Sequence, residues 1–375
     1  MIYLDNAATT CPSKNALSFA DKYNYEKFFN PSALYLGGIE AAKDINVTRD
    51  VILNSLGVFS KDYEVVFTSC GSESDNTAVF CAKKRGVFLT DKGEHSAIYK
   101  SYLELKQRGL STVFIDLNKD GSVNQEKLFD YIKNNKVDFV SIVHVNNETG
   151  AVNDINFIAQ KIKEIDRSIV FHSDGVQAYG KIPFVLSPYV DMYSVSAHKI
   201  NGLKGTGALI KKKSLKISPL IYGGGQENGL RSGTENVFGI KVFEYVIKEH
   251  FENIKANYSK VSEMNNYVRE NVDKEIFHVI SSENASPYVL SISAKNLRGE
   301  VIMHSLEEYG IIVGNGSACS SKNRFSRVIE ACGYKKEILD GVIRLSFSHD
   351  TELNDVMFAT QCLNVVAKKL KGIMG

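Results

Sequence analysis

The sequence predicts an α/β protein in which a large domain with a mainly parallel, seven-stranded sheet is joined to a smaller α+β domain. Short runs rich in β-branched and aromatic residues recur through the first two thirds of the chain, and segments with helical periodicity separate most of them. Beyond about residue 235, a long helical stretch and shorter elements replace this alternation. With 375 residues, the chain is also long enough for two domains.

Seven short apolar runs are the predicted strands of the large sheet, at 64–68, 86–90, 112–116, 139–145, 168–173, 192–196 and 207–210. Segments with helical periodicity lie between several of them, at 74–85, 125–135 and 155–165. Apolar strands that alternate with amphipathic helices are typical of a parallel sheet covered on both faces. Ligands of such sheets bind at the carboxyl ends of the strands, where we therefore look for a site.

The C-terminal third begins with a helical stretch over 235–272, with an expected break near Asn257. Strands are predicted at 286–294 and 341–348, and helices at 301–309 and 353–370. We therefore expect a large, ligand-binding domain over residues 12–250. Residues 1–11 and 251–375 are expected to form the small domain, which carries the loop around Cys319.

The composition is that of a soluble globular protein, with 43% hydrophobic and 23% charged residues. A net charge of +2 gives no reason to expect a nucleic acid partner, and no apolar run is long enough to cross a membrane. The N-terminus shows no targeting pattern. The six cysteines lack paired metal-ligand spacing and indicate reduced thiols, so we expect a cytoplasmic protein without a metal site.

Lys199 follows the predicted strand 192–196 in the segment Ser196-Ala-His198-Lys199, and Asp174 follows the preceding strand. A lysine and an acid at neighbouring strand ends are typical of an enzyme that uses pyridoxal 5′-phosphate (PLP). The lysine amine binds the cofactor covalently, and the acid keeps the pyridine nitrogen protonated so that the ring accepts electrons. Alone, a His-Lys pair on a loop is usually a solvated turn, so this interpretation depends on the motifs that accompany it.

A strand, a small-residue turn and a helix start follow one another over 67–76. Gly71 lets the backbone approach a ligand, and Ser72 offers a hydroxyl and an amide at the helix N-terminus. Together these groups could bind a phosphate, although most such turns are ordinary N-caps.

His95, Asn147 and Gln177 each follow a predicted strand. An imidazole at that edge could stack on a pyridine ring, and the two amides could donate hydrogen bonds to its phenolic oxygen. The alternatives are a structural histidine and common asparagine-rich turns.

Cys319 lies in a polar, glycine-containing loop, GNGSACSS, where reactive cysteines are more often found than structural ones. Arg344 is placed to bind a carboxylate with two parallel hydrogen bonds, although a surface ion pair is equally compatible with its local sequence. The glycine-rich segment 223–234 reads as a loop that crosses a ligand or a subunit boundary.

Taken together, these motifs resemble the cysteine desulfurases of the NifS and IscS type, within the class V aminotransferase family of fold type I PLP enzymes. The matching segments span nearly the whole chain, in order: YLDNAATT (3–10), FNPSALYLGG (29–38), FTSCGSESDN (67–76), EHSA (94–97), HVNNETG (144–150), FHSDGVQAYGK (171–181), SAHKINGLKGTGAL (196–209), GGGQENGLRSGT (223–234), GSACSS (316–321) and IRLSFS (343–348). The resemblance implies the fold of a type I PLP-dependent transferase.

The resemblance also implies a role for each matched residue. Lys199 would bind PLP covalently, and Asp174 would pair with its pyridine nitrogen. Asn6 and Arg344 would bind the substrate carboxylate, and Cys319 would accept sulfur. The remaining cofactor contacts would be His95 against the ring, Asn147 and Gln177 near the phenolic oxygen, and Gly71, Ser72, Ser196, His198 and, from the neighbouring subunit of a homodimer, Thr234 around the phosphate.

The activity implied is removal of sulfur from L-cysteine, which gives L-alanine and a persulfide on Cys319. A sulfur-acceptor protein, either an iron–sulfur scaffold or a tRNA-thiolation enzyme, would then receive the sulfur. Alternatives are a selenocysteine lyase, an aminotransferase of the same family, or a sulfur-relay protein that has lost turnover. The chain ends near Gly375, before the tail with which longer members bind a scaffold, so delivery to a scaffold is the less expected route.

Several positions depart from the family pattern, each by a change that a PLP site can accept. Those positions are Tyr35 for histidine, Cys70 for glycine, Gly71-Ser72 for Ala-Thr, Ala197 for glycine and Leu203 for proline. Cys70 is expected to crowd the phosphate turn most.

Overall fold

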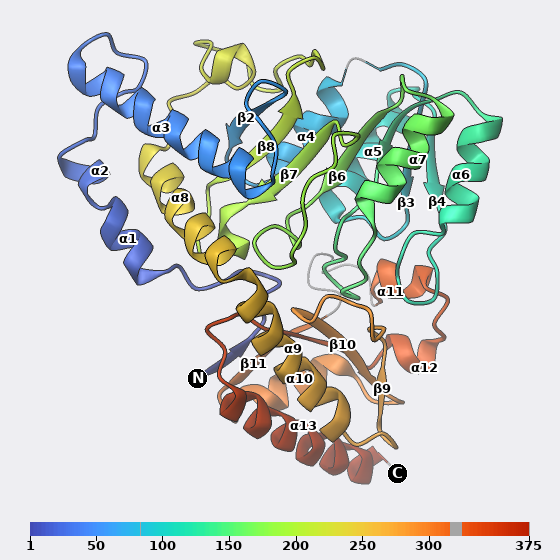
Figure 1. The fold of residues 1–375 in the computed structure, drawn as a ribbon. Coiled ribbons are helices and arrows are strands. Elements are labelled where there is room, and N and C mark those ends of the chain that lie inside the picture. Colours follow the sequence, from blue (N-terminus) through green and yellow to red (C-terminus); the bar gives the residue numbers. More distant parts are fainter. Residues whose placement is uncertain (83, 316–324, 375) are drawn as a thin grey trace.

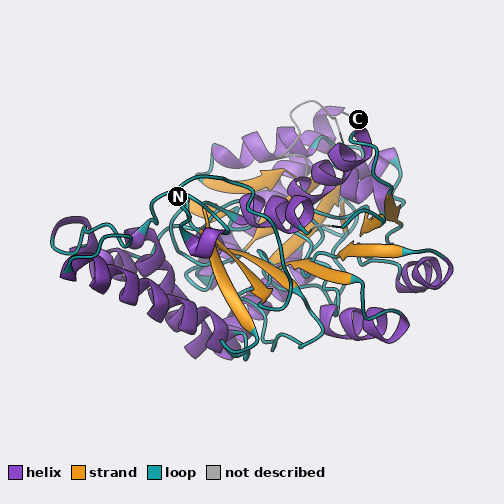
Figure 2. Ribbon diagram, turned by 90° about the horizontal axis from the view of Figure 1, so that it is seen from above, coloured by secondary structure: helices purple, strands orange, loops and turns teal. Residues whose placement is uncertain are grey.

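Two sheets organise the structure, a computed structural model that describes residues 1–82, 84–315 and 325–374 (Figure 1). A seven-stranded sheet lies in the part of the chain up to residue 212, and a five-stranded sheet combines the N-terminal strand with strands from the last hundred residues. The helices gather on both sides of the strands (Figure 2).

The large sheet confirms the predicted α/β fold. Its strands, in spatial order, are β2 (Tyr63–Thr68), β8 (Gly207–Lys212), β7 (Met192–Ser196), β6 (Val170–Asp174), β5 (Val137–Ser141), β3 (Val87–Asp91) and β4 (Thr112–Ile115). β3 to β7 pair in parallel, whereas β8 runs antiparallel to both β2 and β7. The run predicted as a strand over 139–145 leaves the sheet after Ser141, although its last residues stay buried.

Alternate residues of the strands pack on opposite faces of the large sheet. Phe171 and Tyr193 belong to one core, whereas their neighbours Val170 and Met192 belong to another. This period of two is what places helices on both faces. One face is covered by α4 (Gly71–Cys81) and α5 (Ser96–Gln107); the other core includes residues of α1 (Lys14–Ala20), α2 (Lys22–Tyr25), α3 (Leu36–Ser55), α6 (Gln125–Asn134), α7 (Ile155–Ile165) and α8 (Val237–Glu252).

The predicted helical stretch 235–272 consists of two helices, α8 and α9 (Ile254–Asn271), but its break lies at Asn253 and not at Asn257. Residues of α8 up to Ile247 pack in the core of the large sheet, whereas α9 contributes Val261, Met264 and Val268 to the core of the small sheet. The chain therefore turns where it passes from one core to the other.

The small sheet has the order β1 (Ile2–Leu4), β11 (Ile311–Asn315), β12 (Val342–Ser346), β10 (Val289–Ala294) and β9 (Phe277–Val279). The accompanying helices are α10 (Gly299–Glu307), α11 (Arg327–Ala331), α12 (Lys336–Leu339) and α13 (Leu353–Met374). β1 pairs in parallel with β11, so the first residues of the chain belong to this sheet. The boundaries assigned to the two domains, 12–250 and 1–11 with 251–375, stay a prediction.

Across the described ranges, none of the helices combines the length and the apolar character that a bilayer-spanning helix needs.

Candidate active site

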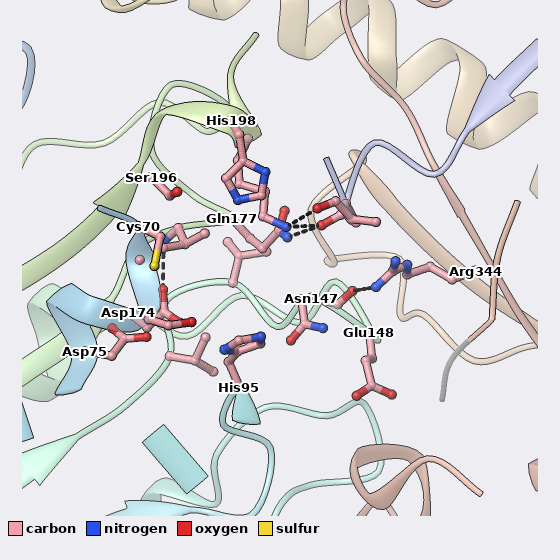
Figure 3. Close-up of a pocket in the computed structure, with 18 of the residues that line it drawn as sticks. Cys70, Asp75, His95, Asn147, Glu148, Asp174, Gln177, Ser196, His198 and Arg344 are labelled. Atoms are coloured by element: carbon pink, nitrogen blue, oxygen red, sulfur yellow. Dashed lines mark hydrogen bonds between the residues drawn. The ribbon is translucent and has the colours of Figure 1, made fainter. Parts of the chain in front are cut away.

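A cavity of about 360 Å³ lies where the carboxyl ends of β2, β6 and β7 meet the N-terminal segment and the small sheet (Figure 3). It brings together all the residues predicted for the site except three. Those that line it are Gly71, Ser72, His95, Asn147, Asp174, Gln177, Ser196, His198, Lys199 and Arg344.

Asp174 and Lys199 meet at this edge because they follow neighbouring parallel strands. Asp174 ends β6, and its Oδ1 atom accepts a hydrogen bond of 2.9 Å from the amide of Val176. Burial raises the pKa of Asp174 to about 6, although that amide and the charge of Lys199 oppose the rise. A cationic ring nitrogen beside this carboxyl would favour its ionised form.

Lys199 ends a 3₁₀ turn, η1 (Ala197–Lys199), directly after β7. Its Nζ atom donates to the carbonyl oxygens of Ala7 and Ala8, at 2.5 and 2.8 Å. The N-terminal segment stays against this turn because the amide and the hydroxyl of Thr10 both donate to the carbonyl of His198, each at 2.9 Å. The matched segment YLDNAATT therefore orients the lysine through its backbone.

One end of the cavity suits a phosphate. α4 begins at Gly71, and its N-cap residue, Cys70, makes no capping hydrogen bond with its side chain. A Cβ atom on Gly71 would lie 2.6 Å from Cγ2 of Val176, so a larger residue would crowd the turn. Ser196 Oγ is buried there and has no hydrogen-bond partner among the described residues. A helix N-terminus beside a free hydroxyl is an arrangement that binds anions.

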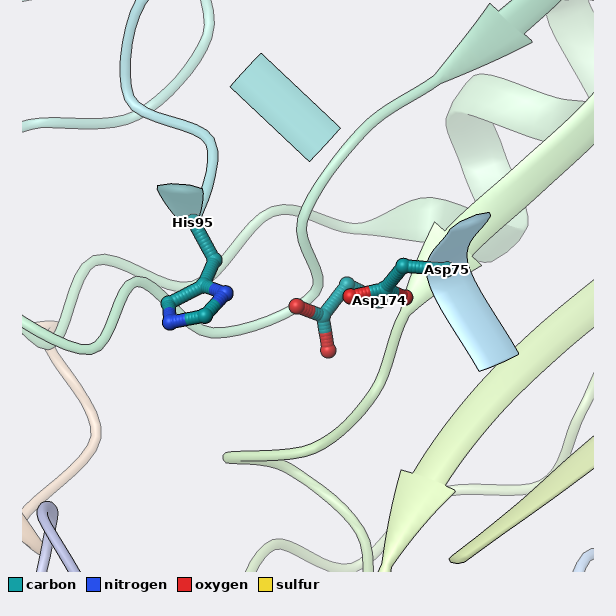
Figure 4. A group of neighbouring side chains, drawn as sticks. All are labelled: Asp75, His95 and Asp174. Carbon is teal, nitrogen blue, oxygen red and sulfur yellow. The ribbon is translucent and has the colours of Figure 1, made fainter. Parts of the chain in front are cut away.

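His95, Asp174 and Asp75 form a compact group in the cavity wall (Figure 4). The ligand atoms of the three side chains all lie within 4.8 Å of one another. His95 caps α5 by accepting a hydrogen bond of 3.2 Å from Ala97 N at its Nδ1 atom. Burial, together with the charges of Lys199 and Arg327, lowers the pKa of His95 to about 4, so the ring is neutral at pH 7. Such a group could also bind a metal ion, and the expected absence of a metal stays a prediction.

Arg344 lines the cavity from β12 and is already held by two partners. Its Nη2 atom contacts Oδ1 of Asp5 at 2.7 Å, and its Nη1 atom donates to the carbonyl of Asn147 at 2.9 Å. The Nε atom is buried without a hydrogen-bond partner among the described residues. The guanidinium is thus oriented and still has a donor to offer to a carboxylate.

Three predicted residues are not part of this cavity. Asn6 donates its amide to the carbonyls of Ser346 and Tyr3, at 2.9 and 3.2 Å, and does not line it. Thr234 lines a separate cavity with Ser69 and Arg231. Cys319 lies outside the described residues. The roles assigned to all three stay predictions.

Sequence reasoning missed several residues that the fold brings to the site. Asp75, Glu148 and Asn315 also line the cavity, and Lys181 lies behind Gln177. A signal existed for Asp75, an acid one helical turn after the phosphate turn, and for Lys181, four residues after Gln177. Cys70, which departs from the family pattern, also lines the cavity.

The chain matches a known protein family over nearly its whole length. The profile of the family described as aminotransferase class-V matches residues 2–358. The chain belongs to the class-V aminotransferase family. Its predicted fold is confirmed by this match and by similar solved structures.

Several relatives in this family are similar over their whole length. The cysteine desulfurase IscS of Dictyoglomus turgidum is 34% identical, and the alignment covers 99% of this chain and 96% of the relative. The cysteine desulfurase IscS of Methanosarcina thermophila is 31% identical, with 99% and 93% covered. Among solved structures, a NifS-like protein from Rickettsia africae matches with a TM-score of 0.90 and 29% identity, over 98% of this chain and 99% of that one.

Class-V aminotransferases are PLP-dependent, and the residues of this site fit that cofactor. The buried, unpaired hydroxyl of Ser196 and the start of α4 suit its phosphate, while Asp174 suits its ring nitrogen. Lys199 lines the same cavity, with its amine oriented by two carbonyls.

Proposed function

We propose that this protein is a PLP-dependent cysteine desulfurase that converts L-cysteine to L-alanine and leaves the sulfur as a persulfide on Cys319. The observation that carries the proposal is the single cavity shared by Lys199, Asp174 and His95, in a chain whose full-length relatives are named cysteine desulfurases.

The reaction is balanced without a further oxidant or reductant. The thiol of Cys319 forms a bond to the sulfur of L-cysteine, and the Cβ–S bond of the substrate breaks. The substrate carbon is reduced by two electrons to the methyl group of alanine. Each of the two sulfur atoms is oxidised by one electron as the persulfide forms.

PLP, when bound, supplies an electron sink for the charge that develops at the substrate Cα atom. Lys199 would hold the cofactor covalently and, once released, take the proton from Cα, a task for which its amine must be uncharged. Asp174 would accept the hydrogen bond of the ring nitrogen, and His95 would lie against the ring as a neutral imidazole. These roles rest on the family resemblance and on the positions of the three side chains.

The substrate carboxylate would bind Arg344 through its remaining N–H donors, since the hydrogen bonds to Asp5 and Asn147 use only two of the five that a guanidinium carries. Asn147 would donate its amide toward the phenolic oxygen of the cofactor or toward the substrate. Cys319, whose segment begins directly after Asn315 of the cavity wall, is assigned from the sequence alone.

The protein is further proposed to be a homodimer. Large apolar side chains are exposed from the end of α2 to the start of α3, where Phe28, Leu34 and Leu36 are 66%, 93% and 79% exposed. Tyr222, beside the glycine-rich loop, is 77% exposed. Exposed apolar groups of this density indicate a protein interface. Thr234, which lines a cavity apart from Lys199, would then reach the phosphate of the other subunit.

The pathway served is inferred from the family resemblance. A persulfide must pass its terminal sulfur to a nucleophile, and we infer an acceptor protein of iron–sulfur cluster assembly or tRNA thiolation. The cytoplasmic location belongs to the same inference.

The experiment that tests the function measures the visible spectrum of the purified protein and the release of alanine and sulfide from L-cysteine with a reducing thiol present. Cys319→Ala should keep the absorbance of bound cofactor and lose alanine formation. Cys11→Ala is the matched control, because this cysteine is exposed and does not line the cavity. Alanine formation that survives Cys319→Ala would favour another class-V enzyme, such as a selenocysteine lyase or an aminotransferase.

A further inference from the structure

Lys181 is a second lysine at the active site, and the mechanism above gives it no task. It lies in the segment that follows β6, four residues after Gln177, and it is 3% exposed. Its Nζ atom donates to Oε1 of Gln177 at 2.9 Å and lies 5.8 Å from the centroid of the Tyr288 ring. A lysine buried in this way loses most of its hydration, and a hydrogen bond to a neutral amide offsets only part of that cost.

The hydrogen bond from Lys181 decides the orientation of the Gln177 amide. An ammonium has only donors, so the atom of Gln177 that faces it must be the oxygen. The nitrogen, Nε2, then points the other way, and it donates to the carbonyl of Ala7 at 2.8 Å. Gln177 lines the cavity, so its remaining N–H is the group available to a ligand there.

The same carbonyl oxygen connects this arrangement to Lys199. Ala7 O accepts from both Gln177 Nε2 and Lys199 Nζ, the latter at 2.5 Å. Lys181, Gln177, Ala7 and Lys199 therefore form one continuous chain of hydrogen bonds between two lysines. Two positive charges held so near each other each make the other easier to deprotonate.

The other charged groups that face Lys181 reinforce this effect. Burial, followed by the charges of Lys199 and Arg344, lowers the pKa of Lys181 to about 7. The charge of Lys181 in turn contributes to the lowered pKa values of His198 and His250. None of these groups is an anion that would cancel the repulsion. Asp174, one of three acids that line the cavity with Asp75 and Glu148, instead favours the charged form of Lys199.

We propose that Lys181 is a positioning residue for Lys199: it orients the Gln177 amide so that its N–H faces the cavity, and its charge keeps the Lys199 amine reactive. This inference rests on the proposed function, because a reactive amine at this position is useful only if Lys199 binds the cofactor. Because the proposal concerns the protonation of the Lys199 nitrogen, the pH profile of the cofactor absorbance tests it better than the rate of turnover does.

The experiment follows the visible absorbance of the full-length holoenzyme as a function of pH, in wild type and in Lys181→Met, Lys181→Gln and Lys181→Arg. The pH midpoint of the absorbance change reports the proton on the nitrogen that joins Lys199 to the cofactor. Removing the charge in Lys181→Met and Lys181→Gln should raise the midpoint by about 1 pH unit, whereas Lys181→Arg should leave it near the wild-type value.

The two uncharged variants separate the two effects of Lys181. Glutamine keeps a donor for Gln177, whereas methionine does not, so only Lys181→Met should also weaken PLP binding, by about tenfold in Kd. Both variants should fold, because they replace a buried cation by a side chain that is cheaper to bury. Lys211→Met is the control, since Lys211 is buried in β8 and does not line the cavity.

A second measurement keeps the inference testable if the wild-type protein binds no PLP, the result that would overturn the proposed function. Acetic anhydride labels uncharged amines, and peptide mass spectrometry gives the labelling rate of Lys199 in cofactor-free protein. Lys181→Met should slow this rate about tenfold at pH 7. An unchanged midpoint and an unchanged labelling rate, or equal shifts in Lys181→Met and Lys181→Arg, would overturn the role of Lys181.

Discussion

The Nε2 atom of His172 lies 3.8 Å from Oδ1 of Asp75, and both side chains are buried. This pair is not an ion pair. Burial lowers the pKa of His172 to about 3, and its two nitrogens are engaged with the hydroxyls of Ser141 and Ser194, each at 2.9 Å. Burial, and then the charge of Asp174, raises the pKa of Asp75 well above its usual value. Burial thus favours the protonated form of Asp75, which lies behind the carboxyl that is proposed to hold the cofactor ring.

Asp75→Asn should therefore be tolerated, because an amide resembles the protonated carboxylic acid that burial favours. The folded state holds the Asp75 proton to a higher pH than the unfolded state does, so wild-type stability falls as pH rises above the ordinary aspartate pKa. The variant lacks this loss. Relative to wild type, its free energy of unfolding should increase between pH 4 and pH 8, by about 1.4 kcal/mol for each unit by which the pKa is raised.

Denaturant unfolding of both proteins across this pH range gives the comparison. A difference that does not change with pH would mean that Asp75 is ionised in the folded protein. The bound-cofactor absorbance of Asp75→Asn should match that of wild type.

Asp174→Asn, unlike Asp75→Asn, should strongly lower the rate of alanine formation. Its carboxyl is proposed to hold the cofactor nitrogen in the protonated state, which an amide cannot do. Loss of one buried hydrogen bond to a charged group costs about 2 to 3 kcal/mol, so alanine formation should fall about 100-fold. Bound cofactor should remain visible, because Lys199 is intact. Asp75→Asn, one side chain away, is the matched control, and an equal loss in both variants would contradict the assignment.

The positions of Asp174, Lys199 and Ser196 could be predicted because they depend on local rules. Each follows or ends an apolar run, and parallel strands bring their carboxyl ends to one edge. The same rule predicts that Gly71 and His95 lie at this edge of the sheet. The pattern of apolar runs therefore predicts most of the residues that line the cavity.

Other contacts depend on packing between distant segments, which periodicity does not encode. Ala7 and Ala8 act through carbonyl oxygens, so their side chains carry no signal. Asn6 binds the backbone of Ser346, 340 residues away, through an amide that the sequence alone could equally assign to a ligand. The break at Asn253 reflects the passage between two cores and not a helix-breaking residue.

Asp5→Asn should weaken substrate binding without slowing the chemical step. Asp5 holds the Nη2 atom of Arg344 at 2.7 Å in a site where the two side chains are 18% and 6% exposed. Without this charge, the guanidinium loses its fixed orientation toward a carboxylate. The KM for L-cysteine should rise about tenfold while kcat stays within about twofold. Steady-state kinetics measure both, with Arg344→Lys as the more severe comparison; a fall in kcat alone would contradict this role.

Glu73→Gln should destabilise the phosphate turn in a pH-dependent way. Glu73 accepts hydrogen bonds from Ser69 N at 2.8 Å and from Arg231 Nε at 2.9 Å, and so joins the turn to the glycine-rich loop. Burial alone would raise the pKa of Glu73, but the bonds from Arg231 and Ser69 outweigh it, so the net shift is downward. A lowered pKa means that the ionised form stabilises the fold above the ordinary glutamate pKa, and that this stability is lost as pH falls through the folded-state value.

At pH 7, Glu73→Gln should therefore lower the free energy of unfolding by about 1 to 3 kcal/mol, and the difference from wild type should shrink toward pH 3. Glu104→Gln is the matched control, because Glu104 pairs with Arg108 on an exposed helix face, where the two side chains are 43% and 60% exposed. That variant should change stability by less than about 0.5 kcal/mol. Denaturant unfolding at pH 7 and pH 3 decides the matter, since a penalty that is equal at both values would mean that Glu73 acts by shape and not by charge.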